Sequence, residues 1–321
     1  MKSVKWGILG AAKFAREHMA RAIHAAEGAE FYALATSSAE KAADFQAFNP
    51  NLVIHDSYDA LLADPDVEAV YIPLPNHLHV EWTLKALAAG KHVLCEKPMA
   101  MKEADFDAII AARDASGLLA AEAYMIVHHP QFTRAKELVA SGAIGDLMLV
   151  DTVFSFNNAA DTNNIRNKPE TGGGALGDIG VYAFGSARFV TGEEPVSIRN
   201  AHIVRENGVD VFTQVMAEFP SFAYQGTVSM RMANRQHITF HGTAGHITLT
   251  APFNAGVYDI AELILEAPAT ERRVERWPTV NQYVLQVENF GKTIRTGAAY
   301  PCPLEFSRGT QAMTDMVLAA E

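Results

Sequence analysis

The sequence is poor in cysteine, in long apolar runs and in positive charge. Only two cysteines, Cys95 and Cys302, occur in 321 residues, so we expect a reducing compartment and no disulfide framework. No apolar run is long enough to span a bilayer and no signal peptide precedes the first expected strand, so we expect a cytoplasmic protein without a membrane partner. Lys and Arg number 26 against 37 Asp and Glu. The resulting formal charge of −11 argues against nucleic acid as a partner.

What is present is ordinary globular composition, with 49% hydrophobic and 20% charged residues. The length is comfortable for two domains. A chain of this size can bury a sizeable core, so the fold requires no structural metal. His77, His79, His128 and His129 lack carboxylate and cysteine partners at ligand spacing, so we expect no metal site.

Short apolar segments alternate with amphipathic ones over the first third of the chain. This alternation predicts a doubly wound parallel sheet, an α/β Rossmann domain, over residues 1–124. The strands are expected at Val4–Leu9, Phe31–Ala35, Val53–Ile54, Ala69–Ile72, His92–Cys95 and Leu118–Tyr124.

From residue 125 to 321 the pattern changes to strands separated by few helices. This predicts an α+β domain with a large, open, mostly antiparallel sheet. The strands are expected at Leu147–Phe156, Val196–Val204, Val211–Phe219, Phe222–Met230, His237–His241 and His246–Thr250. One helix is expected over Leu176–Val190, and two closing helices over Asn281–Arg295 and Leu304–Ala319. A broad sheet face needs a cover, so we expect a homodimer or homotetramer formed through this sheet.

A glycine turn follows the first strand, within Gly7–Ala15. Gly10 permits a sharp turn, and the small Ala15 lets the next helix pack close to the strand. Backbone N–H groups and the helix dipole then face a pyrophosphate, which predicts dinucleotide binding. Ala12 stands where the usual pattern has a second glycine, so the match is incomplete.

The end of the second strand bears on cofactor choice. It reads Ala35-Thr36-Ser37-Ser38, without the carboxylate that would hold the ribose of NAD. Ser37 and Ser38 offer hydroxyls, and Lys41 follows one turn on, which suits the 2′-phosphate of NADP. Both serines would also cap a helix whichever cofactor binds. This segment has no arginine to bind the 2′-phosphate, so NAD stays possible.

Two further segments end strands at the edge where such a sheet binds ligands. Pro73–His79 is stiffened by two prolines, and Asn76 and His77 offer side-chain donors. Glu96-Lys97-Pro98 follows the apolar strand His92–Cys95 and places an ammonium at the same edge.

A glycine-rich stretch, Gly172–Tyr182, carries the remaining candidates. Asp178 and Tyr182 are four residues apart, so they share one helix face. Gly177 and Gly180 are expected to clear space beside them for a substrate. Arg166 lies in a polar loop upstream and is expected to close over this site.

These pieces together resemble the Gfo/Idh/MocA family of dinucleotide-dependent oxidoreductases. The resemblance rests on the turn within Gly7–Ala15, Asn76-x-x-His79, Glu96-Lys97-Pro98, and Gly172-Gly173-Gly174 followed by Asp178-x-Gly180-x-Tyr182. Tyr182 and the segment Asn164-Ile165-Arg166 resemble the branch of dihydrodiol dehydrogenase, glucose–fructose oxidoreductase and NADP-dependent xylose dehydrogenase.

The resemblance implies hydride transfer between NADP, or NAD, and a hydroxyl or carbonyl carbon of a sugar, polyol or related diol. It implies that Lys97 and Tyr182 share the hydroxyl proton while Asp178 orients them. The residues expected at the cofactor are Gly10, Ala11, Ala12, Lys13, Phe14, Ser37, Ser38, Lys41, Leu74, Pro75, Asn76, His79, Glu96, Lys97 and Arg166. Two alternatives stay open: a glycosidase that uses tightly bound NAD for transient oxidation, and a non-catalytic regulator that senses the dinucleotide.

Overall fold

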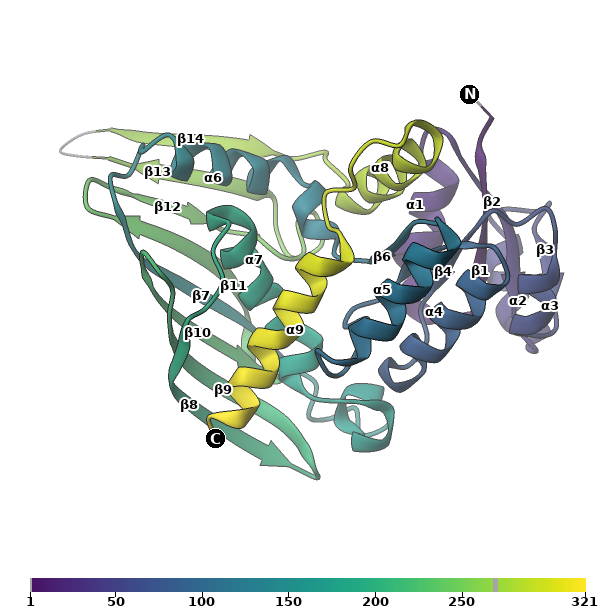
Figure 1. Cartoon of the computed structure of the whole chain (residues 1–321), viewed down its shortest axis with the longest axis horizontal. Helices are drawn as coiled ribbons and strands as arrows, with labels where there is room; N and C mark the ends of the chain where they lie inside the picture. Colours follow the sequence, from purple (N-terminus) through teal and green to yellow (C-terminus); the bar gives the residue numbers. More distant parts are fainter. Residues whose placement is uncertain (1, 268–270) are drawn as a thin grey trace. The chain divides into compact units, whose positions relative to one another are not determined.

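A computed structural model describes residues 2–267 and 271–321 of the chain (Figure 1). The chain forms two compact units. The first extends to Met125 and also contains Asn281–Ser307, whereas the second consists of Ile126–Val280 and Arg308–Glu321. Among the described residues, no helix is long and apolar enough to cross a bilayer.

The first unit contains a six-stranded parallel sheet in the order β3-β2-β1-β4-β5-β6. Its strands are β1 (Val4–Leu9), β2 (Ala29–Ala35), β3 (Val53–His55), β4 (Ala69–Ile72), β5 (His92–Cys95) and β6 (Ala120–Glu122). Nearly every residue of β1, β4 and β5 is buried, as a sheet covered on both faces requires. This confirms the predicted doubly wound fold.

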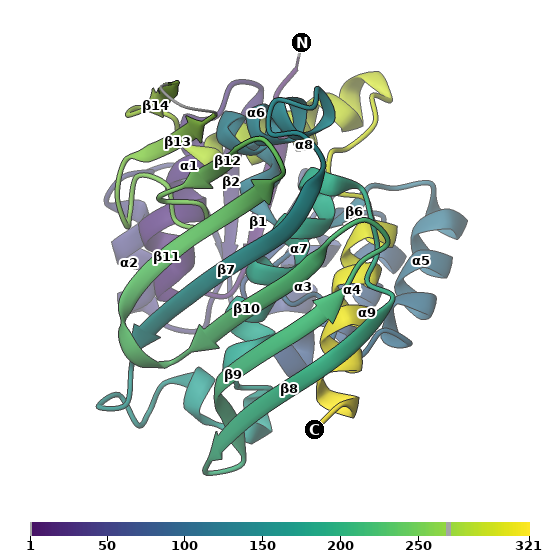
Figure 2. The same ribbon diagram turned by 90° about the vertical axis from the view of Figure 1, so that its left-hand side faces the viewer.

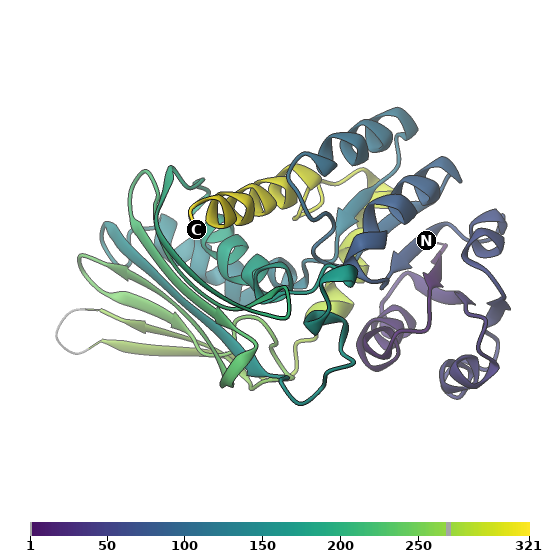
Figure 3. The same ribbon diagram turned by 90° about the horizontal axis from the view of Figure 1, so that it is seen from below.

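Helices cover both faces of this sheet (Figure 3). They are α1 (Ala20–Ala25), α2 (Ala39–Gln46), α3 (Tyr58–Ala63), α4 (His79–Ala88), α5 (Asp105–Ser116) and α8 (Gln282–Thr296), and a π-helical turn over Ala15–Met19 precedes α1. On one face, Leu61, Leu87 and Phe106 pack into a core with side chains of the sheet.

Helix α8 differs from the predicted division of the chain. A boundary between residues 124 and 125 assigns α8 to the second domain, yet it packs in the first unit. The ring of Phe290 on α8 lies 5.0 Å from the ring of Trp6 on β1. Arg295 donates hydrogen bonds of 3.0 and 3.1 Å to the Glu68 carboxylate. The first unit is therefore built from two separate segments of the chain.

The second unit contains an eight-stranded sheet in the order β14-β13-β12-β11-β7-β10-β9-β8 (Figure 2). Its strands are β7 (Leu147–Asn157), β8 (Ser197–Glu206), β9 (Val209–Glu218), β10 (Ala223–Ser229), β11 (Arg231–Gly242), β12 (His246–Leu249), β13 (Ala261–Glu266) and β14 (Arg272–Trp277). The pairing is mostly antiparallel, as predicted. Strands β7 and β10 are the parallel pair, because the segment between them includes α7 (Val181–Thr191) and the β8–β9 hairpin.

The second unit's helices are α6 (Pro130–Ala140), α7 and the part of α9 (Leu304–Ala319) from Arg308 onward, and a π-helical turn over Leu176–Gly180 opens α7. Val150, Phe154 and Tyr224 turn buried side chains to one face of the sheet, whereas Gln225 and Met216 are exposed on the other. Within the described residues, no helix covers that outer face (Figure 2).

Candidate active site

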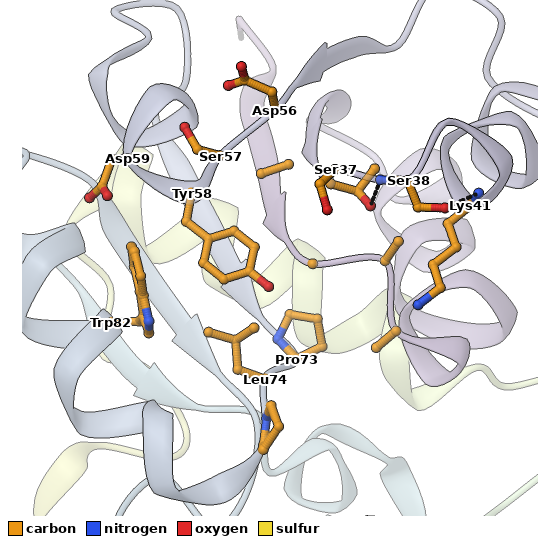
Figure 4. A pocket seen from close by; sticks show the side chains of 16 residues that line it. Ser37, Ser38, Lys41, Asp56, Ser57, Tyr58, Asp59, Pro73, Leu74 and Trp82 are labelled. Atoms are coloured by element: carbon orange, nitrogen blue, oxygen red, sulfur yellow. Dashed lines mark hydrogen bonds between the residues drawn. The ribbon is translucent and has the colours of Figure 1, made fainter.

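A cavity of about 540 Å³ opens in the first unit at the carboxyl ends of its parallel strands (Figure 4). Its lining comes from the turn after β1, the segment after β2, the start of α3 and the loop after β4. The lining residues are Gly10, Ala11, Ala12, Ala35, Thr36, Ser37, Ser38, Lys41, Asp56, Ser57, Tyr58, Asp59, Pro73, Leu74, Pro75 and Trp82. Open parallel sheets bind their ligands at this edge.

The glycine turn has the geometry that a pyrophosphate site needs. Gly10 adopts a φ of +106°, which favours glycine. A Cβ atom at Gly10 would lie 3.2 Å from the Tyr58 hydroxyl oxygen and 3.3 Å from Cδ2 of Leu74, two side chains that line the cavity. At Gly7 a Cβ atom would lie 2.6 Å from Cδ2 of Leu61. The two glycines therefore allow the strand, the turn and α3 to approach closely.

The segment after β2 presents the side chains expected to select NADP. Ser38 caps α2, its hydroxyl accepting a hydrogen bond from the Lys41 N–H at 3.2 Å. Lys41 and Tyr58 reach into the cavity from opposite walls (Figure 4). Ser37, Ser38 and Lys41 thus form one wall, next to the glycine turn. This lining fits a phosphorylated dinucleotide.

Sequence reasoning did not identify five other residues of the lining: Asp56, Ser57, Tyr58, Asp59 and Trp82. Strand β3 pairs in parallel with β2, so that Ala35 is opposite His55 and the segment after β3 meets the segment after β2. The Tyr58 and Trp82 rings meet edge to face with centroids 4.9 Å apart. Ser57, whose hydroxyl caps α3 by accepting from the Ala60 N–H, marks the helix start at which Tyr58 and Asp59 lie, whereas Trp82 lies within α4.

Eight predicted cofactor residues line the cavity: Gly10, Ala11, Ala12, Ser37, Ser38, Lys41, Leu74 and Pro75. Seven others are not in this lining: Lys13, Phe14, Asn76, His79, Glu96, Lys97 and Arg166. Lys13 and Phe14 form the exposed first turn of the helix after Ala12. Asn76 begins the 3₁₀ turn before α4.

His79 has a different role from the one predicted. Its ring is fully buried, with Nδ1 2.7 Å from the Pro98 carbonyl oxygen and Nε2 2.7 Å from the Leu74 carbonyl oxygen. Burial lowers the pKa of His79, and the two carbonyl oxygens oppose that shift. Because both nitrogens are engaged by backbone, His79 holds together the loop after β4 and the turn after β5 and presents no nitrogen to the cavity.

Lys97 lies in the turn at the end of β5, where the neighbouring Glu96 carboxylate accepts two hydrogen bonds. Glu96 accepts a hydrogen bond from the buried Tyr71 hydroxyl at 2.6 Å and another from the Lys97 N–H at 3.2 Å. Burial, and then the neighbouring Glu96, raise the pKa of Tyr71 far above its usual value. Lys97 itself is half-buried.

The second unit brings together three of the other predicted residues. Arg166 donates from Nε to Asp178 Oδ2 at 2.6 Å, and Asp178 is buried. Tyr182, one helical turn beyond Asp178, is 5% exposed. Its ring lies 5.8 Å from that of Phe154 and 6.0 Å from that of Phe253. An acid, a guanidinium and a phenol therefore cluster at the start of α7.

The glycines of this segment serve the backbone. A Cβ atom at Gly173 would lie 2.5 Å from the Arg166 carbonyl oxygen, and one at Gly174 would overlap the Asp210 carboxylate. Asp210 in turn accepts from the Leu176 N–H at 2.7 Å. At Gly180, a Cβ atom would contact Leu176 and Phe184 at 3.3 and 3.4 Å. The expectation that Gly180 clears space for a substrate is wrong, because Gly180 faces packed side chains.

The fold and the cavity of the first unit together define a dinucleotide-dependent oxidoreductase. Residues 4–124 match the oxidoreductase family with an NAD-binding Rossmann fold, and residues 132–248 match the GFO/IDH/MocA C-terminal domain. The chain belongs to the Gfo/Idh/MocA family, as its motifs predicted, and it is an NAD(P)-dependent enzyme.

Three similar proteins illustrate the range of this family. A dTDP-3,4-didehydro-2,6-dideoxy-alpha-D-glucose 3-reductase of Streptomyces violaceoruber is 34% identical over 92% of this chain and 86% of its own. A D-xylose 1-dehydrogenase (NADP(+)) of Haloferax volcanii is 33% identical over 91% of this chain and 89% of its own. The crystal structure of KijD10, a 3-ketoreductase from Actinomadura kijaniata in complex with NADP and TDP-benzene, has a TM-score of 0.90 and 27% identity over 99% of this chain and 98% of its own.

Proposed function

We propose that this enzyme transfers a hydride between NADP and a hydroxyl or carbonyl carbon of a sugar, polyol or related diol. The observation that carries the proposal is the cavity lining, in which a glycine turn adjoins Ser37, Ser38 and Lys41 with no carboxylate at the end of β2. The two curated relatives act on sugars by name, and KijD10 was crystallised with NADP.

The cofactor residues divide by the part of NADP that they would hold. Gly10, Ala11 and Ala12 would bind the pyrophosphate through backbone N–H groups. Ser37, Ser38 and Lys41 would hold the 2′-phosphate by charge-assisted hydrogen bonds. When bound, NADP supplies the hydride or accepts it.

Proton transfer is assigned to Lys97 of the first unit and Tyr182 of the second. In oxidation the substrate hydroxyl loses its proton to these groups as the carbinol carbon loses its hydride, and reduction reverses both transfers. Asp178, held by Arg166, would orient the tyrosine. Asn76, Glu96 and Arg166 remain proposed cofactor contacts.

The pH dependence of the two directions should differ. Lys97 must be protonated to give a proton in reduction and neutral to accept one in oxidation. The pH optimum for reduction should therefore lie below that for oxidation, measured as kcat/KM in both directions. Identical optima would contradict Lys97 as the proton carrier.

The test is a substrate panel with NADP and with NAD, followed by the absorbance of the reduced nicotinamide. The panel contains free aldoses including D-xylose, polyols, diols and dTDP-activated 3-ketosugars. Activity that is lost in Lys97→Met and kept in Lys102→Met, an exposed lysine five residues on, would support the proposal. Release of free sugar from glycosides without net cofactor turnover would overturn it.

The proposal also includes a homo-oligomer formed through the large sheet and a cytoplasmic location. The outer sheet face exposes Met216 at 53%, so a second copy of the chain is the proposed cover. Light scattering should give a dimer or tetramer mass that falls to one chain in Met216→Lys. Both cysteines are buried thiols, which suits the cytoplasm.

A further inference from the structure

One side chain of the cavity lining, Tyr58 at the start of α3, lies directly beside the glycine turn. A Cβ atom at Gly10 would lie 3.2 Å from the Tyr58 hydroxyl oxygen, so this oxygen is close to the backbone of Gly10. Ala11 and Ala12, the next residues of the turn, line the same cavity, and the Tyr58 side chain points into it (Figure 4). The phenol is therefore next to the segment that is proposed to bind the pyrophosphate.

The Tyr58 ring is held in this position by packing. It meets the Trp82 ring of α4 edge to face, with centroids 4.9 Å apart. Nζ of Lys85 lies 4.1 Å from the centroid of the Trp82 ring and donates to the Glu81 carboxylate at 2.7 Å. Tyr58 and Trp82 also pack against the hydrophobic core of this face of the sheet. Because the ring is packed on these sides, its hydroxyl is directed into the cavity before any ligand binds.

The Tyr58 hydroxyl is available as a hydrogen-bond donor. Within residues 2–267 and 271–321, no side chain or backbone group forms a hydrogen bond with it. In contrast, the buried Tyr71 donates to Glu96 at 2.6 Å, and the hydroxyls of Tyr224 and Thr152 lie 2.7 Å apart. Burial raises the pKa of Tyr58, so its hydroxyl keeps its proton at neutral pH. A protonated hydroxyl that points into a cavity is suited to an acceptor on a ligand, such as a phosphate oxygen.

The composition of the glycine turn and of the lining gives such a donor a use. A second glycine usually lets the backbone approach a pyrophosphate, and Ala12 stands at that position here. Among the described lining residues Lys41 is the one cation, whereas Asp56 and Asp59 bring two carboxylates. A neutral O–H donor attracts a phosphate oxygen without requiring a further cation, and hydrogen bonds to charged groups are stronger than those between neutral groups.

We propose that Tyr58 is a further cofactor-binding residue, whose hydroxyl donates a hydrogen bond to the pyrophosphate of the dinucleotide at the glycine turn. The inference rests on the proposed function, in which Gly10, Ala11 and Ala12 bind the pyrophosphate. NADP and NAD share this group, so Tyr58 strengthens the binding of both cofactors and does not choose between them. That choice is the proposed role of Lys41 at the 2′-phosphate.

The test is Tyr58→Phe, which removes the hydroxyl and keeps the ring that packs on Trp82. The control is Tyr32→Phe, which removes the hydroxyl of a half-buried tyrosine of β2 that is not in the cavity lining and faces Asp66 at 3.5 Å. Calorimetric titration gives the Kd of NADPH, NADH, 2′-phospho-ADP-ribose and adenosine 2′-monophosphate. The third ligand keeps the pyrophosphate without the nicotinamide, and the fourth keeps the 2′-phosphate without the pyrophosphate. Thermal unfolding checks that both variants fold.

In Tyr58→Phe the Kd should rise about tenfold for the three ligands that contain the pyrophosphate. The Kd of adenosine 2′-monophosphate should stay within about twofold, and Tyr32→Phe should match the wild type for every ligand. Unchanged Kd values for the three pyrophosphate ligands would overturn the inference. An equal loss for adenosine 2′-monophosphate would also overturn it, because the hydroxyl would then act at the adenosine or its 2′-phosphate. If the wild type binds neither NADPH nor NADH, the proposed function fails, and the inference fails with it.

Discussion

Lys41 is the single cation among the sixteen residues that line the described cavity, which also contains the carboxylates of Asp56 and Asp59. A phosphate beside Ser37 and Ser38 would therefore depend on this one ammonium for its countercharge. Charge-assisted hydrogen bonds of this kind contribute roughly 1.5–3 kcal/mol. Recognition of the 2′-phosphate is thus concentrated in one side chain.

Replacing Lys41 with Met should weaken NADPH binding much more than NADH binding. Because the site is open to solvent, we expect the Kd for NADPH to rise about tenfold, or about 1.4 kcal/mol, and the Kd for NADH to change by less than twofold. Titration of nicotinamide fluorescence measures both constants, with Lys102→Met as control. An equal loss for both cofactors would instead place Lys41 at the pyrophosphate.

The sequence predicted the part of this cavity whose residues belong to local motifs. Gly10, Ser38 and Lys41 lie in strand–turn–helix segments whose composition shows their role. Asp56 could not be placed in the same way, because it reaches the cavity only through the pairing of β3 with β2. His79 was predicted at the cofactor because Asn76-x-x-His79 resembles the family's motif. Only the coordinates show that its two nitrogens are engaged by backbone carbonyls.

At the scale of elements, strands β13 and β14 of the second unit were not predicted, and their sequences differ in how clearly they indicate a strand. Strand β13, Ala261–Glu266, alternates buried and half-buried residues. This period of two in the side chains is the pattern that predicts a strand. Strand β14, Arg272–Trp277, has no buried residue and four charged ones, so its pattern resembles a polar loop. It pairs at the edge of the sheet, where charge is common.

Helix α8 could not be assigned to the first unit from sequence, because it follows the last strands of the second unit in the chain. Its start is fixed by Asn281, whose Oδ1 accepts from the N–H groups of Tyr283 and Val284 at 3.0 and 3.3 Å. Its buried face, which includes Val287 and Phe290, then packs in the first unit. The N-cap that starts α8 is thus encoded in the adjacent sequence. The packing of α8 in the first unit depends on residues far apart in the chain.

Asn281→Ala should destabilise the first unit by about 1 kcal/mol, the usual effect of losing an N-cap. Amide hydrogen exchange should show the loss in α8, β1 and β2, because α8 packs there. Asn281→Ser keeps a capping oxygen and should lose far less. Loss of protection confined to β8 and β9 would contradict the assignment of α8 to the first unit.

At the scale of the whole molecule, we expect acid stability to depend on two adjacent histidines of the second unit. His128 and His129 are both buried, and burial lowers their pKa values to about 3 and about 4. His129 also caps α6, since its Nδ1 accepts from the Gln131 N–H at 3.2 Å. Neither ring is expected to carry charge in the folded protein at neutral pH.

Both histidines should reduce the free energy of unfolding as the pH falls below 6.5. The unfolded chain then binds protons at these rings with an ordinary pKa of about 6.5, whereas the folded protein does not bind them until about pH 4 or below. Each ring therefore removes about 1.4 kcal/mol per pH unit between pH 6.5 and 4. Their contribution is fully present above pH 6.5 and is lost progressively in acid.

Buried acids such as Asp210 and Glu122 have raised pKa values and act in the opposite direction, so the slope of the wild type alone cannot isolate the histidines. The comparison is with His129→Asn, which can still cap α6 but does not titrate. Between pH 6.5 and 4.5, urea unfolding should lose about 1.4 kcal/mol less per pH unit in this variant than in the wild type. Exposed His241→Asn is the control and should follow the wild type. Parallel pH curves for His129→Asn and the wild type would mean that the folded protein takes up a proton at His129 as readily as the unfolded chain, and burial would then not be the cause of acid sensitivity.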